Sequence, residues 1–90
     1  MSAAREAYAR LILAQGGLFQ DRQLPAEAEQ AYQLALSLNP GYAAGVFKYV
    51  DLLTQQKRFD EARQIAQTAV NTAPHNEQFR EVLTQLSKMK

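Results

Sequence analysis

The side chains that could take part in chemistry are few in this chain. Its 90 residues hold one histidine and no cysteine, so a thiol nucleophile, a thiolate metal site and a disulfide scaffold are excluded. His75 follows Pro74, and only Glu77 is close in sequence as a second ligand. A metal site or a catalytic base needs several such groups that converge. We therefore interpret His75 as a solvent-exposed turn residue.

Two neighbouring carboxylates, Asp60 and Glu61, are the other candidates for acid–base chemistry. Adjacent residues of a helix point in different directions, whereas acids in a first turn stabilise the helix dipole. The phosphate-loop, dinucleotide-binding, serine-hydrolase and zinc-protease motifs do not occur in the sequence. We predict no enzymatic activity, no catalytic residue, no bound metal and no cofactor.

Charge and hydropathy exclude further classes. Ten Lys and Arg residues against nine Asp and Glu residues give a net charge of +1, so no strong basic field points to nucleic acid or acidic lipid. The longest apolar run, residues 11–14, is too short to span a membrane. The N-terminus shows no signal-peptide pattern. We expect a cytoplasmic protein that binds neither nucleic acid nor membrane, an expectation that a larger precursor would change.

The elements that would position a site follow from an internal repeat with a period of about 34 residues, which is typical of stacked helical units. Small residues recur at the same phase, which suits helix crossings, where a small side chain lets two helices approach closely. When residues 9–42 are laid over 43–76, the eight identical positions are Ala9/Ala43, Leu18/Leu52, Glu27/Glu61, Ala28/Ala62, Gln30/Gln64, Gln33/Gln67, Ala35/Ala69 and Pro40/Pro74.

Each unit is predicted to contain two helices joined by a short turn. Apolar residues fall three and four positions apart, which is the spacing of one helix face. Pro25 fits a first helical turn, and Pro40 and Pro74 follow the second helix of each unit. We place the helices of the second unit at about residues 43–56 and 60–72. The predicted inward positions are Tyr8, Leu11, Ile12, Gly16 and Phe19; Ala28, Ala31, Tyr32, Ala35 and Leu36; Val46, Tyr49, Val50 and Leu53; Ala62, Ile65, Ala66, Ala69 and Val70.

A fifth helix is predicted over about residues 77–90. Asn76 is a suitable N-cap for it. Its outward positions Thr84 and Ser87 are polar, which is typical of a helix that closes the end of a repeat array.

The pattern resembles the tetratricopeptide repeat, a helix–turn–helix unit of about 34 residues. The turn of the second unit, Arg58-Phe59-Asp60-Glu61-Ala62, looks like the Tyr-x-Glu-Ala element of that family. The resemblance implies an all-α fold, a right-handed α-solenoid of antiparallel helix pairs with five helices. We expect one domain over residues 1–90, with repeats at about 9–42 and 43–76 and a capping helix at about 77–90. The matching residues are Gly16, Phe19, Ala28, Tyr32, Ala35 and Pro40 in the first unit and Leu53, Phe59, Ala62, Ala69 and Pro74 in the second.

Gly16 and Gly17 stand together inside the first helix, where each glycine costs roughly 1 kcal/mol relative to alanine. Gly16 matches the close-packing position of the family. Gly17 does not, so either the helix tolerates it or a groove approaches the backbone there, and we favour tolerance.

Members of this family bind partners in a groove lined by the first helix of each pair. Leu13 and Phe47 occupy the same position in adjacent units, so we expect an exposed apolar anchor rimmed by Arg10, Lys48 and Asp51. The alternatives are that these two residues are ordinary scattered surface hydrophobes, or that the last helix covers them. The groove positions are Arg10, Leu13, Gly17, Gln20 and Asp21; Phe47, Lys48, Asp51 and Gln55; Gln78, Val82 and Gln85.

Two functions remain open. The first is a protein–protein interaction module that binds a peptide or helix of a partner in this groove. The second is a structural segment that forms a homodimer, or docks within a larger multi-repeat protein, through the groove or the N-terminal end. That end has no obvious cap, because only a few residues precede Tyr8 and Leu11. A clamp for a C-terminal carboxylate is not expected, since Lys48 alone supplies a basic residue at the positions that such clamps use.

Overall fold

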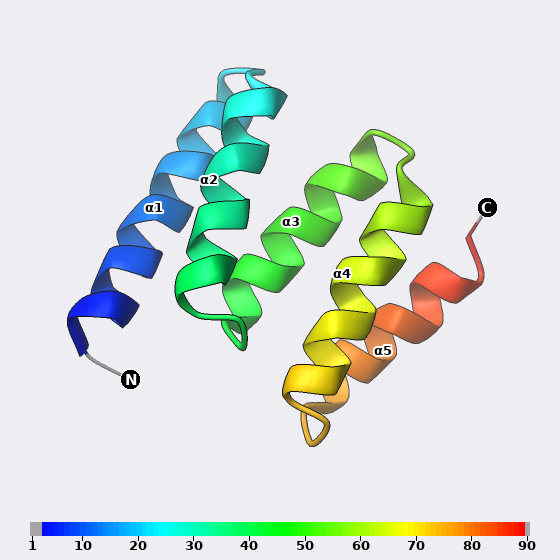
Figure 1. Ribbon diagram of the computed structural model, residues 1–90. Helices are drawn as coiled ribbons and strands as arrows, with labels where there is room; N and C mark the ends of the chain where they lie inside the picture. The colour runs from blue at the N-terminus through cyan, green and yellow to red at the C-terminus, as the bar shows by residue number, and fades with distance from the viewer. Residues whose placement is uncertain (1–2, 90) are drawn as a thin grey trace.

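The structure is a computed structural model that describes residues 3–89. Neighbouring helices run antiparallel along most of the chain, and α3 contacts both helices of the first pair (Figure 1). These residues contain no strand, so the fold is all-α, as the sequence predicts. The five helices are α1 Ala3–Asp21, α2 Pro25–Leu38, α3 Ala43–Gln55, α4 Phe59–Thr72 and α5 Glu77–Ser87.

The period of the sequence is also a period of the structure. Helices α2 and α4 begin at Pro25 and Phe59 and end at Leu38 and Thr72, so both pairs of ends are separated by one full repeat. Pro25 opens its helix, as expected. The two pairs are therefore copies of one helix–turn–helix unit.

The turn inside each pair closes in the same way. Gln23 and Lys57 both have a φ of 61°, the left-handed conformation that commonly ends a helix. The N–H of Leu24 donates to the carbonyl oxygen of Phe19 over 2.9 Å, and the equivalent bond of the second pair is 2.8 Å. This bond satisfies a carbonyl that the end of the helix leaves free.

The molecule is thin, with extents of 36 × 32 × 14 Å. The helices form a single layer of pairs, so the core lies between neighbouring helices. In such an array each element buries surface only against its neighbours. The repeated alanines at the helix crossings, such as Ala28 and Ala62, are fully buried, as predicted. The largest fully buried side chains are Tyr32, Phe79, Leu53 and Val46.

Two of the inward positions predicted for α1 are wrong. Tyr8 and Leu11 are 56% and 59% exposed. Helix α1 packs against α2 and, at a few positions, against α3, and neither covers this side of it. The spacing of apolar residues identifies an apolar face, but it does not reveal whether another element lies over that face.

Side-chain hydrogen bonds hold both ends of helix α5. The side-chain oxygen of Asn76 accepts a hydrogen bond from the N–H of Phe79 at 3.2 Å, which confirms the predicted N-cap. At the other end, Arg63 of α4 donates to the carbonyl oxygens of Leu86 and Met89, each at 3.3 Å. Helix α5 ends at Ser87, before the end predicted at residue 90. Residue 90 itself lies outside the described residues.

Candidate functional site

A hollow of about 370 Å³ lies between α3 and α5. On each helix the lining residues recur at intervals of one and three positions, which places them on one face of α3 and one face of α5, and Met89 lies just beyond the end of α5. Apolar side chains predominate, and two carboxylates and two further polar groups accompany them. The lining residues are Phe47, Val50, Asp51, Thr54, Glu81, Val82, Gln85, Leu86 and Met89. We call this the α3–α5 hollow.

Four residues of the predicted groove meet in the α3–α5 hollow: Phe47, Asp51, Val82 and Gln85. Thr54 and Glu81 also line the hollow, although the predicted groove does not include them. Thr54 lies two turns after Phe47 on the same helix face, so helical spacing alone would have found it. Glu81 lies three positions after Gln78 and four before Gln85, both predicted groove positions, so the same spacing would have found it as well.

Leu13 is not the exposed anchor that the sequence analysis predicts. It is 7% exposed and belongs to the hydrophobic core. Its partner Phe47 is half-buried, and the ring of Phe47 meets the ring of Phe79 edge-on, with centroids 5.7 Å apart. Both side chains point toward the next unit of the array. Helix α3 covers Leu13 in the first unit, and α5 partly covers Phe47 in the second. Of the expected pair, only Phe47 lines the hollow.

The other predicted groove residues lie outside the α3–α5 hollow. Arg10 and Lys48 are exposed on α1 and α3 and do not line it, so basic residues are not part of the rim of this hollow. A Cβ added at Gly17 would meet no atom within 4 Å. This open space fits both interpretations of Gly17, tolerance by the helix and a groove that reaches its backbone.

A run of polar side chains connects the remaining groove positions. The amide of Gln20 donates to Gln55 Oε1 at 3.3 Å, and the amide of Gln55 donates to Asp51 Oδ2 at 3.1 Å. The hydroxyl of Tyr32 donates to Gln20 Oε1 at 2.6 Å. Burial is the main reason that the pKa of Tyr32 is raised, so this hydroxyl remains a donor. The run orients Asp51 at the edge of the hollow.

The charge of the α3–α5 hollow is negative. Asp51 projects from α3 and Glu81 from α5, and both are exposed. Among the lining residues in the described part of the chain there is no lysine, arginine or histidine. An acidic rim above an apolar floor favours a ligand that presents an apolar side chain beside a basic one, because complementary charge selects and orients partners.

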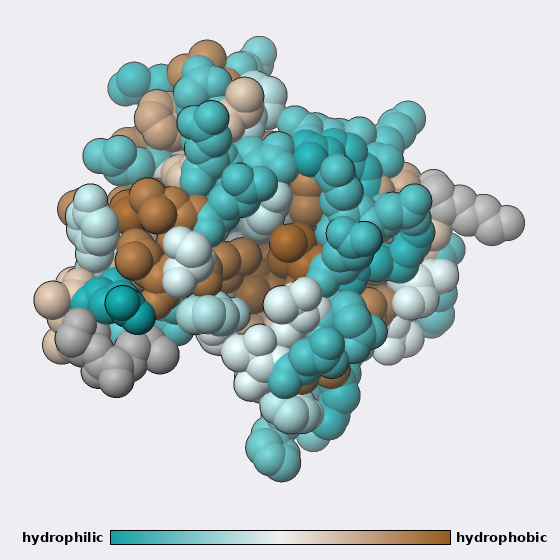
Figure 2. Space-filling model, in the orientation of Figure 1, coloured by the Kyte–Doolittle hydropathy of each residue, from teal (hydrophilic) through white to brown (hydrophobic). Residues whose placement is uncertain are grey.

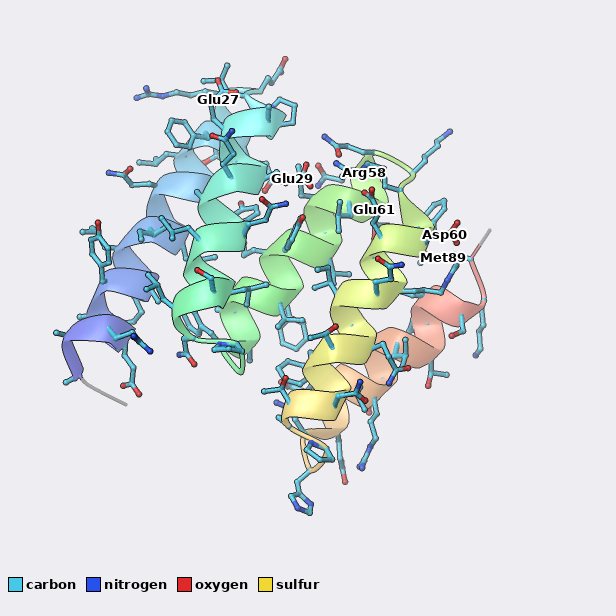
Figure 3. All side chains as sticks on the ribbon, in the orientation of Figure 1. Glu27, Glu29, Arg58, Asp60, Glu61 and Met89 are labelled. Carbon is cyan, nitrogen blue, oxygen red and sulfur yellow. The ribbon has the colours of Figure 1, made fainter. Side chains whose placement is uncertain are left out.

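A second polar cluster joins the two helix pairs (Figure 3). Arg58, in the turn before α4, donates through Nη1 and Nη2 to Oε1 and Oε2 of Glu29 on α2, at 2.7 and 2.9 Å. Its Nε also donates to Glu61. The hydroxyl of Tyr49 donates to Glu29 Oε2 at 2.8 Å. A two-point contact of this kind has a defined geometry, so the cluster sets how the second pair is oriented on the first.

This cluster makes the stability of the fold depend on pH. Hydrogen bonds from Arg58 are the main cause that lowers the pKa of Glu29 from 4.5, and burial opposes them. Because the folded pKa is the lower one, the carboxylate stabilises the fold above pH 4.5, and this stabilisation is lost as the pH falls through the folded pKa.

We therefore expect Glu29→Gln to be less stable than the native chain near neutral pH, and the difference to shrink below pH 4.5. Urea denaturation followed by circular dichroism at several pH values measures this. Glu27→Gln changes an exposed carboxylate of the same helix, which points away from Arg58 (Figure 3), and serves as the control. A difference between Glu29→Gln and the native chain that does not vary with pH would contradict the assignment.

Other kinds of site find little support in the described residues. None of the helices formed by residues 3–89 has the length and hydrophobicity needed to cross a bilayer. In the same range, no three His, Asp or Glu side chains gather where they could hold a metal ion. His75 is exposed in the turn between α4 and α5, so its interpretation as a solvent-exposed turn residue is confirmed.

The comparisons with known proteins agree with this architecture. A family model described as tetratricopeptide repeat matches residues 20–86, well over half of the chain. A search of curated proteins gives no match. Members of the family are typically non-enzymatic modules that mediate protein–protein interaction. The matched residues run from the last turn of α1 into α5, and on this basis the chain belongs to the tetratricopeptide repeat family.

Proposed function

We propose that the α3–α5 hollow binds a segment of a partner protein that presents an apolar side chain next to a basic one. The observation that carries this proposal is the lining, in which Phe47 and Val82 supply apolar surface from two different helices, below the carboxylates of Asp51 and Glu81. Its volume of about 370 Å³ is near the lower end of the range for ligand pockets. That is room for one or two side chains, which suits an anchor residue.

The walls of the hollow are held in place before any ligand arrives. The ring of Phe47 rests against Phe79, which is fully buried. Asp51 accepts the hydrogen bond from Gln55. Side chains that are already ordered lose less conformational entropy on binding, and this lowers the free-energy cost of association.

The contributions to binding divide between the floor and the rim. Burial of an apolar anchor such as leucine stabilises a complex by about 1.5–3 kcal/mol. The exposed carboxylates Asp51 and Glu81 contribute less to affinity, because water screens them, and more to the choice of partner. Both contributions are needed to distinguish this hollow from an ordinary exposed hydrophobic residue.

The test uses a short fluorescein-labelled peptide with a central leucine flanked by arginines, titrated with the full chain and followed by fluorescence anisotropy. Val82→Glu places a carboxylate on the floor and should weaken binding about tenfold or more. Asp51→Lys reverses a charge of the rim and should also weaken binding, with a larger effect at low salt than at high salt.

Two comparisons decide whether the effects are specific. Asp21→Lys makes the same change in net charge on an exposed residue of α1 outside the hollow, and it should leave the affinity nearly unchanged. A peptide in which glutamates replace the arginines should bind more weakly to the native chain. Equal affinity of the two peptides, or equal effects of the two lysine variants, would disprove the proposal.

A further inference from the structure

The outer side of the first helix pair carries a second apolar hollow, of about 350 Å³. Figure 2 shows apolar surface over α1 and α2 on this side of the molecule. Leu34 is 47% exposed here, although leucine is a residue that proteins usually bury. The lining residues, which we call the N-terminal face, are Tyr8, Ile12, Gln15, Phe19, Glu27, Gln30, Ala31 and Leu34.

The repeat itself shows what kind of element covers a surface of this layout. The equivalent crevice of the second pair lies between α3 and α4. Inside the array it is covered by the α2 segment, whose Leu36 and Pro40 help to line it. The position of Phe19 likewise corresponds to Leu53, which is fully buried. Three residues of the N-terminal face match residues of that crevice at the equivalent positions of the two units: Ile12/Val46, Ala31/Ile65 and Leu34/Thr68.

The contacts of α2 with α3 define the chemistry of such an occupant. The ring of Tyr32 lies 6.3 Å from the ring of Tyr49, and the amide of Gln33 donates to the Tyr49 hydroxyl at 2.9 Å. Leu36 lies against Gly45, where an added Cβ would be 3.0 Å from Leu36 Cδ2. Tyr32, Gln33 and Leu36 therefore form the face of an amphipathic helix that docks on α3.

Two residues of α1 differ from α3 at these contacts. Gln15 stands at the position of Tyr49, so an aromatic side chain of the occupant would meet an amide and not a ring. Leu11 corresponds to Gly45, and its side chain is 59% exposed. Inside the array Leu36 occupies the space beside the small Gly45. On the N-terminal face the side chain of Leu11 takes up the equivalent space. An occupant of the N-terminal face must then carry a small residue at the position that Leu36 has in α2.

We propose that the N-terminal face binds an amphipathic helix of a partner chain, which carries a small residue at the position that Leu36 has in α2. A second copy stacked end to end fits poorly, because the opposite end of the array is polar. That end, the outer side of α5, is lined by Glu77, Arg80, Glu81, Thr84 and Gln85. This proposal does not depend on the α3–α5 hollow.

The probe is a fluorescein-labelled peptide with the sequence of residues 24–41 carrying Leu36→Ala. A lactam bridge on its outward side holds it helical, because isolated helices of this length are marginal in water. Titrated with the full chain, it should bind. Leu34→Glu in the chain should weaken binding about tenfold or more, since a carboxylate then faces apolar surface.

Matched variants locate the contact. Leu18→Glu makes the same substitution at a leucine that is 56% exposed and lies outside the N-terminal face, and it should not change the affinity. Val82→Glu, in the α3–α5 hollow, should not change it either, so this test and that of the proposed function fail independently. A peptide that keeps leucine at position 36 should bind more weakly than the alanine form.

Several results would overturn the proposal. These are the absence of peptide binding, an equal effect of Leu34→Glu and Leu18→Glu, or tighter binding by the leucine form of the peptide. Light scattering on the chain alone gives the last test. A dimer that Leu34→Glu dissociates would show that a second copy, and not a partner helix, occupies the N-terminal face.

Discussion

Replacement of Phe79 by alanine is expected to lower the free energy of unfolding by about 3–5 kcal/mol. Phe79 is among the largest fully buried side chains and stacks edge-on against Phe47. Its removal leaves a cavity where α5 joins the array. Because small domains unfold with about 5–15 kcal/mol in total, this one substitution removes a large part of the stability. Urea denaturation followed by circular dichroism measures the loss.

The same substitution should also abolish peptide binding in the α3–α5 hollow, because α5 forms one of its walls. Phe79→Leu retains most of the buried volume and should lose about 1.5 kcal/mol or less, so it separates the effect of the cavity from that of the ring. A loss below about 1 kcal/mol for Phe79→Ala would show that α5 does not pack as described.

Gly16→Ala and Gly17→Ala are expected to change stability in opposite directions, although the two glycines are neighbours in one helix. A Cβ at Gly16 would lie 2.5 Å from Tyr32 Cε1 and 3.1 Å from Ala31 Cβ. The ring of Tyr32 is fully buried and its hydroxyl is bonded to Gln20, so it has little room to move. Overpacking of this kind costs about 1–3 kcal/mol.

At Gly17 nothing lies within 4 Å of an added Cβ, and the higher helix propensity of alanine should stabilise the chain by about 0.5–1 kcal/mol. Each variant is the control for the other, since both make the same change in the same helix. Thermal unfolding of the two proteins side by side is sufficient. Destabilisation of both to the same extent would mean that close approach to Tyr32 is not the reason for glycine at Gly16.

Most of the fold could be predicted from the sequence because its signals are local. Pro25 and Asn76 mark the starts of helices α2 and α5, and both act where the sequence places them. The repeated alanines, such as Ala28 and Ala62, predicted close helix crossings and are buried. The signals for helix starts involve residues within one or two helical turns, and the alanine signal comes from the repeat itself, so both follow from the order of residues along the chain.

The candidate site could be predicted only in part. Phe47, Asp51, Val82 and Gln85 come together because their places follow from the helix faces and the order of the units. Leu13 has the same place in its unit as Phe47, yet it is buried in the core. The bond between Arg58 and Glu29, which are 29 residues apart, left no pattern in the sequence.

The sequence by itself determined the repeating helix pairs, their turns and the polar outer side of α5. These properties depend on residue type and on neighbours along the chain. Only the tertiary structure decided which apolar faces are covered. Leu13 is covered by an element that follows it, whereas Leu11 and Leu34 remain exposed on the first helix pair. The physical reason is that periodicity places a side chain on one side of a helix, while its burial depends on what packs against that side.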